Sequence, residues 1–229
     1  MKTVVYNGSR EIYQNMVSAA KSLLTHTAVD KIFFLIEDDV FPYPLPPIIE
    51  TINVSGLVSQ IFRPDGPNYR STWTPIGLIR WALTKVFPDF DTILAIDADT
   101  IVMQDISDLW ELSLDDCYFA AAKEPVLTQN RGYFYTNAGV MLINLKKLRE
   151  DGKDNEIISA LNKRHFFFVG QDAANLLCQG HILEIPSDYN ACDFTLPAEN
   201  KKILHFAGRK EWVNGELARQ YREMPWPKP

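Results

Sequence analysis

The alternation of elements at the start of the chain limits the possible fold more than any other feature. Residues 3–7 form a short β-branched run, residues 12–24 carry apolar side chains at helical spacing, and residues 31–36 are typical of a buried strand. A strand, a helix and a strand of these lengths predict a β–α–β unit, which requires a parallel sheet. The chain is therefore expected to be an α/β protein with a mostly parallel central sheet flanked by helices.

The same periodicity predicts further elements along the chain. Prolines between residues 42 and 47 exclude regular structure from most of residues 37–70, apart from a strand at 48–53. Ser71 or Thr72 is expected to cap a helix that has Pro75 in its first turn and ends before Pro88. We then expect strands at 92–96, 118–122, 138–144, 182–185 and 202–206, and helices near 106–110, 154–162 and 171–179.

One domain covering residues 1–229 is expected, because no repeat, low-complexity tract or flexible linker is visible. Its C-terminal part is expected to be irregular, with residues 213–229 at the periphery. The proline-rich residues 224–229 cannot be helical, so they either pack through Trp226 or fray.

Composition excludes several classes of protein. The 229 residues are 46% hydrophobic and carry a net charge of −6, which argues against nucleic-acid binding because that requires a basic stripe. The cysteines, Cys117, Cys178 and Cys192, are too few and too irregularly spaced for a disulfide framework or a zinc site. The sequence contains no apolar stretch of about 20 residues, so it predicts no membrane span. Its N-terminal residues lack the apolar run of an export signal. A cytoplasmic protein is therefore expected.

The sharpest functional signal is a pair of carboxylates directly after the strand at 92–96. One residue, Ala98, separates Asp97 from Asp99, so in an extended chain the two side chains share a face, about 7 Å apart at the Cα atoms. Two carboxylates so placed repel each other unless a cation lies between them. Because open α/β sheets bind ligands at the carboxyl ends of their strands, we expect the pair to hold Mg²⁺ or Mn²⁺ on a phosphate-containing ligand. The structural alternative is a solvated turn in which Asp99 caps the next segment.

Two classes of enzyme place an Asp-x-Asp pair after a strand. In dehalogenase-type phosphatases the first aspartate is a nucleophile, whereas in nucleotide-sugar glycosyltransferases the pair holds a metal on the donor diphosphate. The phosphatase motif usually lies near the start of a chain, and here about 95 residues precede the pair. A metal-dependent phosphatase or nucleotidyltransferase, or a non-catalytic nucleotide-sugar-binding protein, stays an alternative.

Five blocks of sequence, in order, resemble glycosyltransferase family eight, the group that includes glycogenin and bacterial lipopolysaccharide galactosyltransferases. They are IDADTIV at 96–102, DISDLW at 105–110, NAGVMLINL at 137–145, QDAAN at 171–175 and ILHFAG at 203–208. The resemblance covers residues 1 to about 212. It implies a GT-A fold, with a Rossmann-like nucleotide half and a smaller acceptor half.

The resemblance implies an enzyme that moves a hexose from a UDP-sugar to an acceptor, with retention at the anomeric carbon. Asp97, Asp99 and His205 match the family's metal ligands, and an imidazole beside two carboxylates fits Mn²⁺ better than Mg²⁺. The acceptor is left open and could be a glycan, a protein or a small molecule. The oligomeric state is also left open.

The resemblance also assigns residues to the donor and to the chemistry. Arg80, which lies 17 residues before Asp97, matches a donor-contacting arginine, and Gln171 is expected near the anomeric carbon. We expect front-face displacement through an oxocarbenium-like ion pair. A covalent intermediate on Asp172 or Glu124 is the alternative, and Asp172 could instead cap the following helix. The residues expected to contact the donor or its metal are Asn7, Gly8, Arg80, Asp97, Ala98, Asp99, Asn137, Ala138, Gly139, Gln171, His205, Gly208 and Lys210.

The chain departs from the family pattern at two places. The family commonly has a lysine six residues past the metal histidine, where this chain has Glu211, preceded by Arg209 and Lys210. The family's aspartate before the Gln-Asp pair is replaced by Gly170. The basic residue that contacts the diphosphate, Arg209 or Lys210, is therefore left open, and so is the identity of the donor sugar. The loops at 40–47 and 63–70 are candidates for the rim of the acceptor site.

Overall fold

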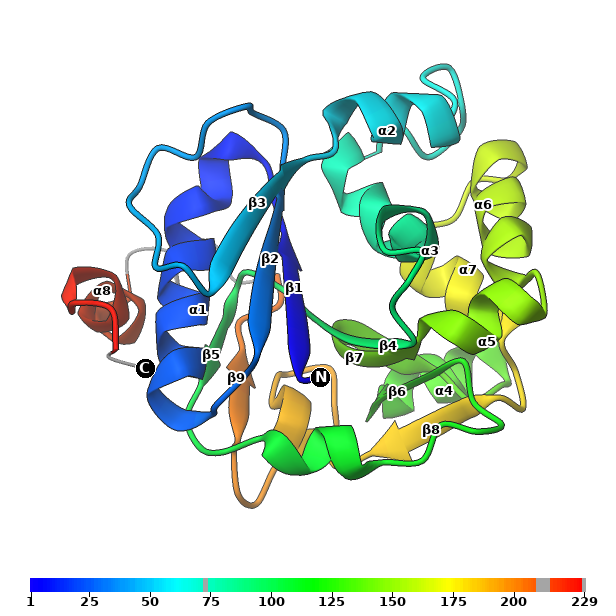
Figure 1. The fold of residues 1–229 in the computed structure, drawn as a ribbon. Coiled ribbons are helices and arrows are strands. Elements are labelled where there is room, and N and C mark those ends of the chain that lie inside the picture. The colour runs from blue at the N-terminus through cyan, green and yellow to red at the C-terminus, as the bar shows by residue number, and fades with distance from the viewer. Residues whose placement is uncertain (72–73, 209–214, 228–229) are drawn as a thin grey trace.

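A seven-stranded sheet runs through the part of the chain that the structure describes, residues 1–71, 74–208 and 215–227 of a computed structural model (Figure 1). Within these residues only β7 runs antiparallel to its neighbours, so the expected mostly parallel sheet is confirmed. Strand β7 follows β6 through the segment 124–135, which returns the chain so that the two strands pair antiparallel. The strands, in spatial order, are β3 (Ile49–Asn53), β2 (Lys31–Ile36), β1 (Thr3–Asn7), β4 (Thr92–Ile96), β7 (Thr136–Asn144), β6 (Phe119–Lys123) and β8 (Ile182–Ile185).

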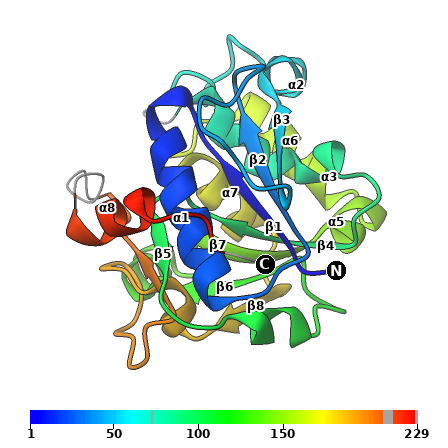
Figure 2. The same cartoon turned by 60° about the vertical axis from the view of Figure 1, so that its left-hand side comes forward.

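Helices cover both faces of this sheet (Figures 1 and 2). One face carries α1 (Tyr13–His26), next to a small sheet of β5 (Thr100–Val102) and β9 (Ile203–His205). The other face carries α2 (Ser55–Ile61), the 3₁₀ helix η2 (Pro75–Ala82), α3 (Leu83–Val86), α5 (Leu145–Glu150), α6 (Lys153–Lys163) and α7 (Val169–Leu177). The shorter connecting helices are η1 (Arg10–Ile12), η3 (Ser107–Glu111), α4 (Pro125–Arg131) and η4 (Ser187–Asn190).

The hydrophobic core lies in two layers, one on each face of the sheet. Along β1, Val4 and Tyr6 pack on the α1 side, whereas Val5 packs on the side of α2 and η2. This division follows from the alternation of side chains along a strand. The buried strands β1, β2 and β4 are therefore apolar on both faces, which explains their continuous runs of apolar residues.

The region around residue 70 differs from the sequence prediction. The helix begins at Pro75 after Thr74, not at Ser71 or Thr72, and it is a 3₁₀ helix as far as Ala82; Thr72 lies outside the described residues. The expectation that 37–70 is irregular beyond the strand is wrong for α2. There the side chain of Asn53 accepts a hydrogen bond from the backbone N–H of Ser55 at 3.0 Å, a local turn that starts the helix directly after β3.

The C-terminal helix α8 (Glu216–Glu223) packs against α1. The buried Lys21 on α1 donates to the backbone carbonyls of Arg222, at 2.8 Å, and Met224. The indole of Trp226 donates to the carbonyl of Pro44 at 3.1 Å. Of the two expected outcomes for the tail, packing through Trp226 or fraying, the structure shows packing through Trp226. No helix among the described residues is both long enough and apolar enough to cross a membrane.

Candidate functional site

Backbone pairing brings Asp97, Asp99 and His205 together. Asp97 follows β4, and its N–H donates to the carbonyl of Gly139 on β7 at 2.8 Å. The chain then turns into β5, which pairs with β9 so that Thr100 lies opposite His205. The N–H of Phe206 donates to the carbonyl of Asp99 at 2.9 Å, which extends this pairing. A histidine more than a hundred positions later in the chain is thereby fixed beside the carboxylate pair.

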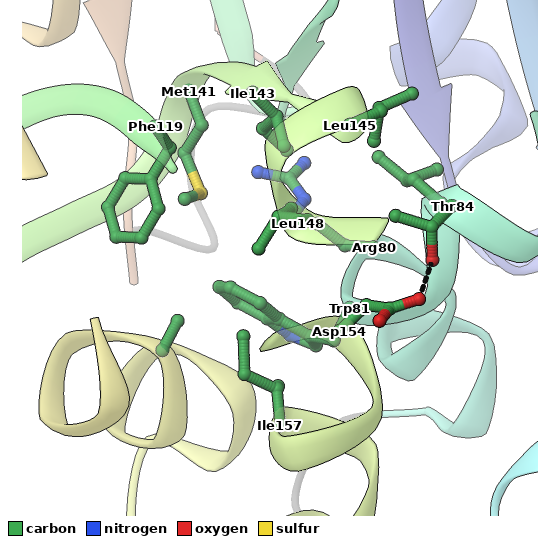
Figure 3. Close-up of a pocket in the computed structure, with 12 residues that line it drawn as sticks. Arg80, Trp81, Thr84, Phe119, Met141, Ile143, Leu145, Leu148, Asp154 and Ile157 are labelled. Atoms are coloured by element: carbon green, nitrogen blue, oxygen red, sulfur yellow. Dashed lines mark hydrogen bonds between the residues drawn. The ribbon is translucent and has the colours of Figure 1, made fainter. Parts of the chain in front are cut away.

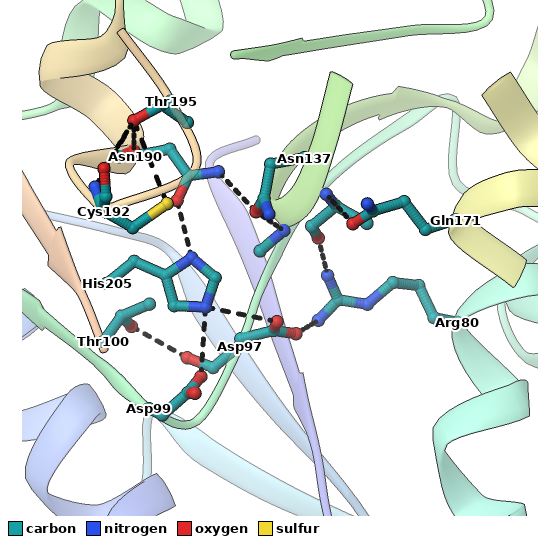
Figure 4. Close-up of polar contacts among 12 residues, drawn as sticks. Arg80, Asp97, Asp99, Thr100, Asn137, Gln171, Asn190, Cys192, Thr195 and His205 are labelled. Carbon is teal, nitrogen blue, oxygen red and sulfur yellow. Dashed lines mark hydrogen bonds and ion pairs between the residues drawn. The ribbon is translucent and has the colours of Figure 1, made fainter. Parts of the chain in front are cut away.

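The three side chains converge in the way that the sequence predicts (Figure 4). His205 Nε2 lies 3.3 Å from Asp99 Oδ1 and 3.6 Å from Asp97 Oδ2. One ligand atom from each residue lies within 4.8 Å of the other two. The imidazole is 3% exposed, whereas the carboxylates of Asp97 and Asp99 are 40% and 31% exposed. The cluster is therefore buried at the imidazole and open to a ligand at the carboxylates.

Charges around this cluster favour a cation. Burial lowers the pKa of His205, but the hydrogen bond with Asp99, the contact with Cys192 and the two carboxylate charges outweigh it and raise that pKa to about 10. Burial raises the pKa of Asp97, and Arg80 and His205 offset this effect only in part. A protonated His205 therefore supplies positive charge beside the two carboxylates, as a bound metal ion would. Two hard carboxylates and one imidazole form a donor set that suits Mn²⁺.

Arg80 approaches the cluster from η2. Its guanidinium pairs with Asp97 Oδ1 at 2.5 Å and donates to the carbonyl of Ala138. The side chain is 5% exposed. Behind it lies a cavity of about 20 Å³ between η2, α6 and α7, which is also lined by Thr84 and Asp154 (Figure 3). This space has room for about one water molecule and is too small for a sugar.

Asn7 and Gly8 lie at the same edge of the sheet. Strand β1 pairs in parallel with β4, with Val5 opposite Ala95, and this register places Asn7 level with Asp97. Gly8 is buried, and a Cβ at this position would lie 2.6 Å from the side chain of Ile12. Packing against η1 therefore accounts for the glycine, while Asn7 is half-buried at this edge of the sheet.

Gln171 and Asn137 meet at a buried carboxylate, Glu124. Both side-chain amides donate to Glu124 Oε1, at 3.2 Å from Gln171 and 2.6 Å from Asn137. Gln171 Oε1 accepts the backbone N–H of Ala138 at 2.8 Å. Glu124 is 4% exposed, and burial raises its pKa. These contacts hold the Gln171 amide beside the carbonyl that Arg80 binds, so the structure groups Gln171 with the acidic cluster.

Asp172 is fully engaged away from solvent. Its carboxylate accepts from Arg131 at 3.0 Å, from the hydroxyl of Tyr135 at 2.7 Å and from the backbone N–H of Phe168 at 3.0 Å. The side chain is 4% exposed. The contact with the N–H of Phe168, the residue before α7, favours the helix-capping interpretation of Asp172, and the other contacts pair the carboxylate with Arg131 and Tyr135.

The segment after His205 is described only in part. Gly208 has φ = 72°, a left-handed conformation that favours glycine. The ring of Phe194 lies 3.9 Å from the position of a Cβ at Gly208. Lys210 and Arg209, the two candidates for a diphosphate contact, lie outside the described residues.

Sequence reasoning missed a residue that contacts His205 directly. Asn190, at the end of η4, is 0% exposed and accepts a hydrogen bond from His205 Nδ1 at 2.7 Å. A single asparagine at the end of a short 3₁₀ helix has no pattern of its own. The only available signal was its proximity in sequence to the strand that carries His205.

Comparison with known families identifies the chain. The model of glycosyl transferase family 8 matches residues 16–214. The chain belongs to glycosyltransferase family 8. The glycosyltransferase GlyE of Streptococcus pneumoniae is 27% identical over 252 residues, which cover 98% of this chain and 60% of that protein. The lipopolysaccharide 1,2-glucosyltransferase of Escherichia coli K12 is 28% identical over 152 residues, covering 60% of this chain and 45% of that protein.

Solved structures confirm the fold expected of this family. An active-site mutant of LgtC superposes with a TM-score of 0.77 at 20% sequence identity, covering 96% of this chain and 94% of LgtC. The GT-A fold expected from the family blocks is therefore confirmed. This family 8 chain spans less than two thirds of the length of GlyE and of the glucosyltransferase.

Proposed function

We propose that the protein is a metal-dependent, retaining glycosyltransferase that moves a hexose from a UDP-sugar to an acceptor. The observation that carries the proposal is the convergence of Asp97, Asp99 and His205 at the carboxyl edge of a GT-A sheet, with Arg80 paired to Asp97. A family 8 chain with this donor set suits Mn²⁺ bound to a diphosphate.

Charge is the main contribution that these residues make. Asp97, Asp99 and His205 Nε2 would hold the metal, and a bound Mn²⁺ supplies positive charge where the leaving diphosphate becomes negative. Arg80 lowers the pKa of Asp97 against the effect of burial, and their contact at 2.5 Å orients the carboxylate. Each 1.4 kcal/mol of preferential stabilisation of the departing group gives about a tenfold gain in rate.

Gln171 would contribute position. Its contacts with the N–H of Ala138, with Glu124 and with the hydroxyl of Tyr135 fix the amide plane at the edge of the cluster. An amide is a poor nucleophile, and the oxygens of Asp172 are occupied by Arg131, Tyr135 and Phe168. We therefore propose front-face displacement, in which the departing UDP helps to deprotonate the acceptor, without a covalent sugar–enzyme intermediate.

The acceptor side is proposed from a hollow in the surface and from the polar groups that line it. An open hollow of about 300 Å³ lies after the carboxyl end of β2 and is lined by Arg10, Asp38, Asp39, Val40 and Pro42. It includes part of the loop at 40–47 that the sequence suggests for the acceptor rim. A carboxylate pair and an arginine can hydrogen-bond hydroxyl groups, so a hydroxylated acceptor fits this surface.

Turnover of UDP-sugars tests the proposal. The purified chain is incubated with Mn²⁺ and a panel of UDP-hexoses, and the release of UDP is measured with and without EDTA. We expect release that depends on the metal and that Asp99→Asn abolishes, while Asp89→Asn, at an exposed aspartate, leaves it unchanged. Release of phosphate from simple phosphate esters without UDP-sugar turnover would show a phosphatase instead.

A further inference from the structure

Asn190 connects the imidazole of His205 to the buried polar groups of β7. Its side chain lies between His205 Nδ1, at 2.7 Å, and Asn137 Oδ1, at 2.9 Å (Figure 4). The backbone fixes its place, because the N–H of Ala191 donates to the carbonyl of Ile203 at 2.9 Å and the N–H of His205 donates to Ala191 at 3.0 Å. Asn190 is 0% exposed, so no water competes for these contacts.

The direction of each hydrogen bond in this chain of contacts is determined. The backbone N–H of Gly139 can only donate, and it donates to the side chain of Asn137 at 2.8 Å, which identifies the acceptor there as the oxygen. The Asn190 atom that faces this oxygen must then be the NH₂ group. The other Asn190 atom, which faces His205, is therefore an oxygen, and His205 Nδ1 must carry a hydrogen.

The far side of Asn137 agrees with this direction. Its NH₂ group donates to the carboxylate of Glu124 at 2.6 Å. A carboxylate accepts hydrogen bonds, so Glu124 and the Gly139 N–H both require the same orientation of the Asn137 amide. Two independent groups thus set the orientation that Asn190 passes on to His205.

We propose that Asn190 is the positioning residue that fixes the tautomer of His205. A metal-binding imidazole is neutral and carries one hydrogen, and the oxygen of Asn190 holds that hydrogen on Nδ1. The lone pair is then on Nε2, the nitrogen that faces Asp97 and Asp99. This inference rests on the proposed metal site, and it adds a requirement outside the three ligands.

Binding of Mn²⁺ alone, followed by electron paramagnetic resonance of the free ion, tests the inference without a sugar. Asn190→Leu removes the acceptor at similar volume and is expected to weaken Mn²⁺ binding about 10- to 100-fold, the range for residues that orient metal ligands. Asn190→Asp keeps an oxygen toward Nδ1, and in its protonated form the second oxygen can donate to Asn137 Oδ1 as the amide does, so this variant is expected to bind within about threefold of the wild type. Rescue by this conservative variant would not occur if Asn190 only filled space.

Asn68→Leu is the matched control. Asn68 is 2% exposed and holds the backbone of Leu161, Arg164 and Phe166 by hydrogen bonds, away from the cluster. Its variant is expected to lose stability but not Mn²⁺ affinity. If Asn190→Leu does not fold, Asn190→Ser, whose hydroxyl is too short to reach Nδ1, is compared with Asn190→Asp in its place.

The outcomes separate the two proposals. If the wild type does not bind Mn²⁺, the proposed metal-dependent function is wrong. If the wild type binds Mn²⁺ and folded Asn190→Leu binds equally well, or Asn190→Asp loses as much affinity as Asn190→Leu, the inference about Asn190 is overturned while the metal site stands.

Discussion

Gly139 leaves no room for any side chain beside His205, so Gly139→Ala is expected to damage the proposed metal site directly. A Cβ at this position would lie 2.2 Å from Cε1 and 2.4 Å from Nδ1 of the imidazole, whereas ordinary contacts begin at 3.4 Å. The ring must therefore move by about 1 Å or more, or β7 must shift. A shifted ring separates Nδ1 from Asn190 and moves Nε2 from its place between Asp97 and Asp99.

The expected magnitudes follow from this clash. Overpacking at a buried site costs about 1–3 kcal/mol of unfolding free energy, and a misplaced ligand is expected to weaken Mn²⁺ binding about tenfold or more. Urea denaturation and Mn²⁺ titration of the same preparation measure the two effects. Gly56→Ala is the control: a Cβ at Gly56, in α2, meets nothing within 4 Å, so stability should be unchanged or rise slightly. Wild-type Mn²⁺ affinity in a folded Gly139→Ala protein would refute the reasoning.

Three further predictions concern protons and packing. Because the pKa of His205 is raised to about 10, Mn²⁺ binding at about pH 7.5 should release close to one proton. Calorimetry in two buffers of different ionisation enthalpy measures this release. A heat of binding that is the same in both buffers would contradict the prediction. Asp154 has a lowered pKa because the bonds from Lys85 and Thr84 outweigh burial, so its contribution is complete above about pH 4 and is lost as the pH falls below that value. Urea unfolding should therefore show Asp154→Asn less stable than the wild type by about 1–2 kcal/mol at pH 7, with the difference shrinking at about pH 3. Lys21→Met should remove both hydrogen bonds to the end of α8, so limited proteolysis should cleave the tail faster, and an unchanged cleavage rate would mean that Lys21 does not hold α8.

The sequence predicts well the features that repeat at a fixed period or follow a strand directly. The strands β1, β2 and β4 are apolar on both faces, so their runs are continuous and their ends are sharp. Asp97 and Asp99 follow such a run, and this placement is enough to expect a cation at the sheet edge. His205 could be added only through the family blocks, because its partner is separated from it by more than a hundred positions.

Features that depend on contacts between distant segments could not be predicted from the sequence. Strand β5 has three residues and exists because β9 pairs with it, and no periodicity is visible over so short a run. Asn190 acquires its role from Gly139 and Glu124, which lie on other elements. The helix α2 begins from an Asn53 side-chain contact that has no hydrophobic signature. For β5 and Asn190 the decisive hydrogen bonds join groups that no sequence window contains, whereas the contact between Asn53 and Ser55 is local and lacks only a hydrophobic pattern.

The same coupling between distant positions limits what relatives say about the donor sugar. The family resemblance implies an aspartate before the Gln-Asp pair, and this chain has Gly170 there. A Cβ at Gly170 would lie 1.8 Å from Trp81 Nε1 and 2.2 Å from Cδ1, so the indole occupies the space into which an aspartate side chain would extend. Trp81 follows Arg80 in the sequence, and Gly170 precedes Gln171. The contact between Trp81 and Gly170 therefore lies beside two residues of the proposed site. An aspartate therefore cannot be restored at 170 while Trp81 keeps its place, so the family's aspartate and the indole of Trp81 exclude each other at this position.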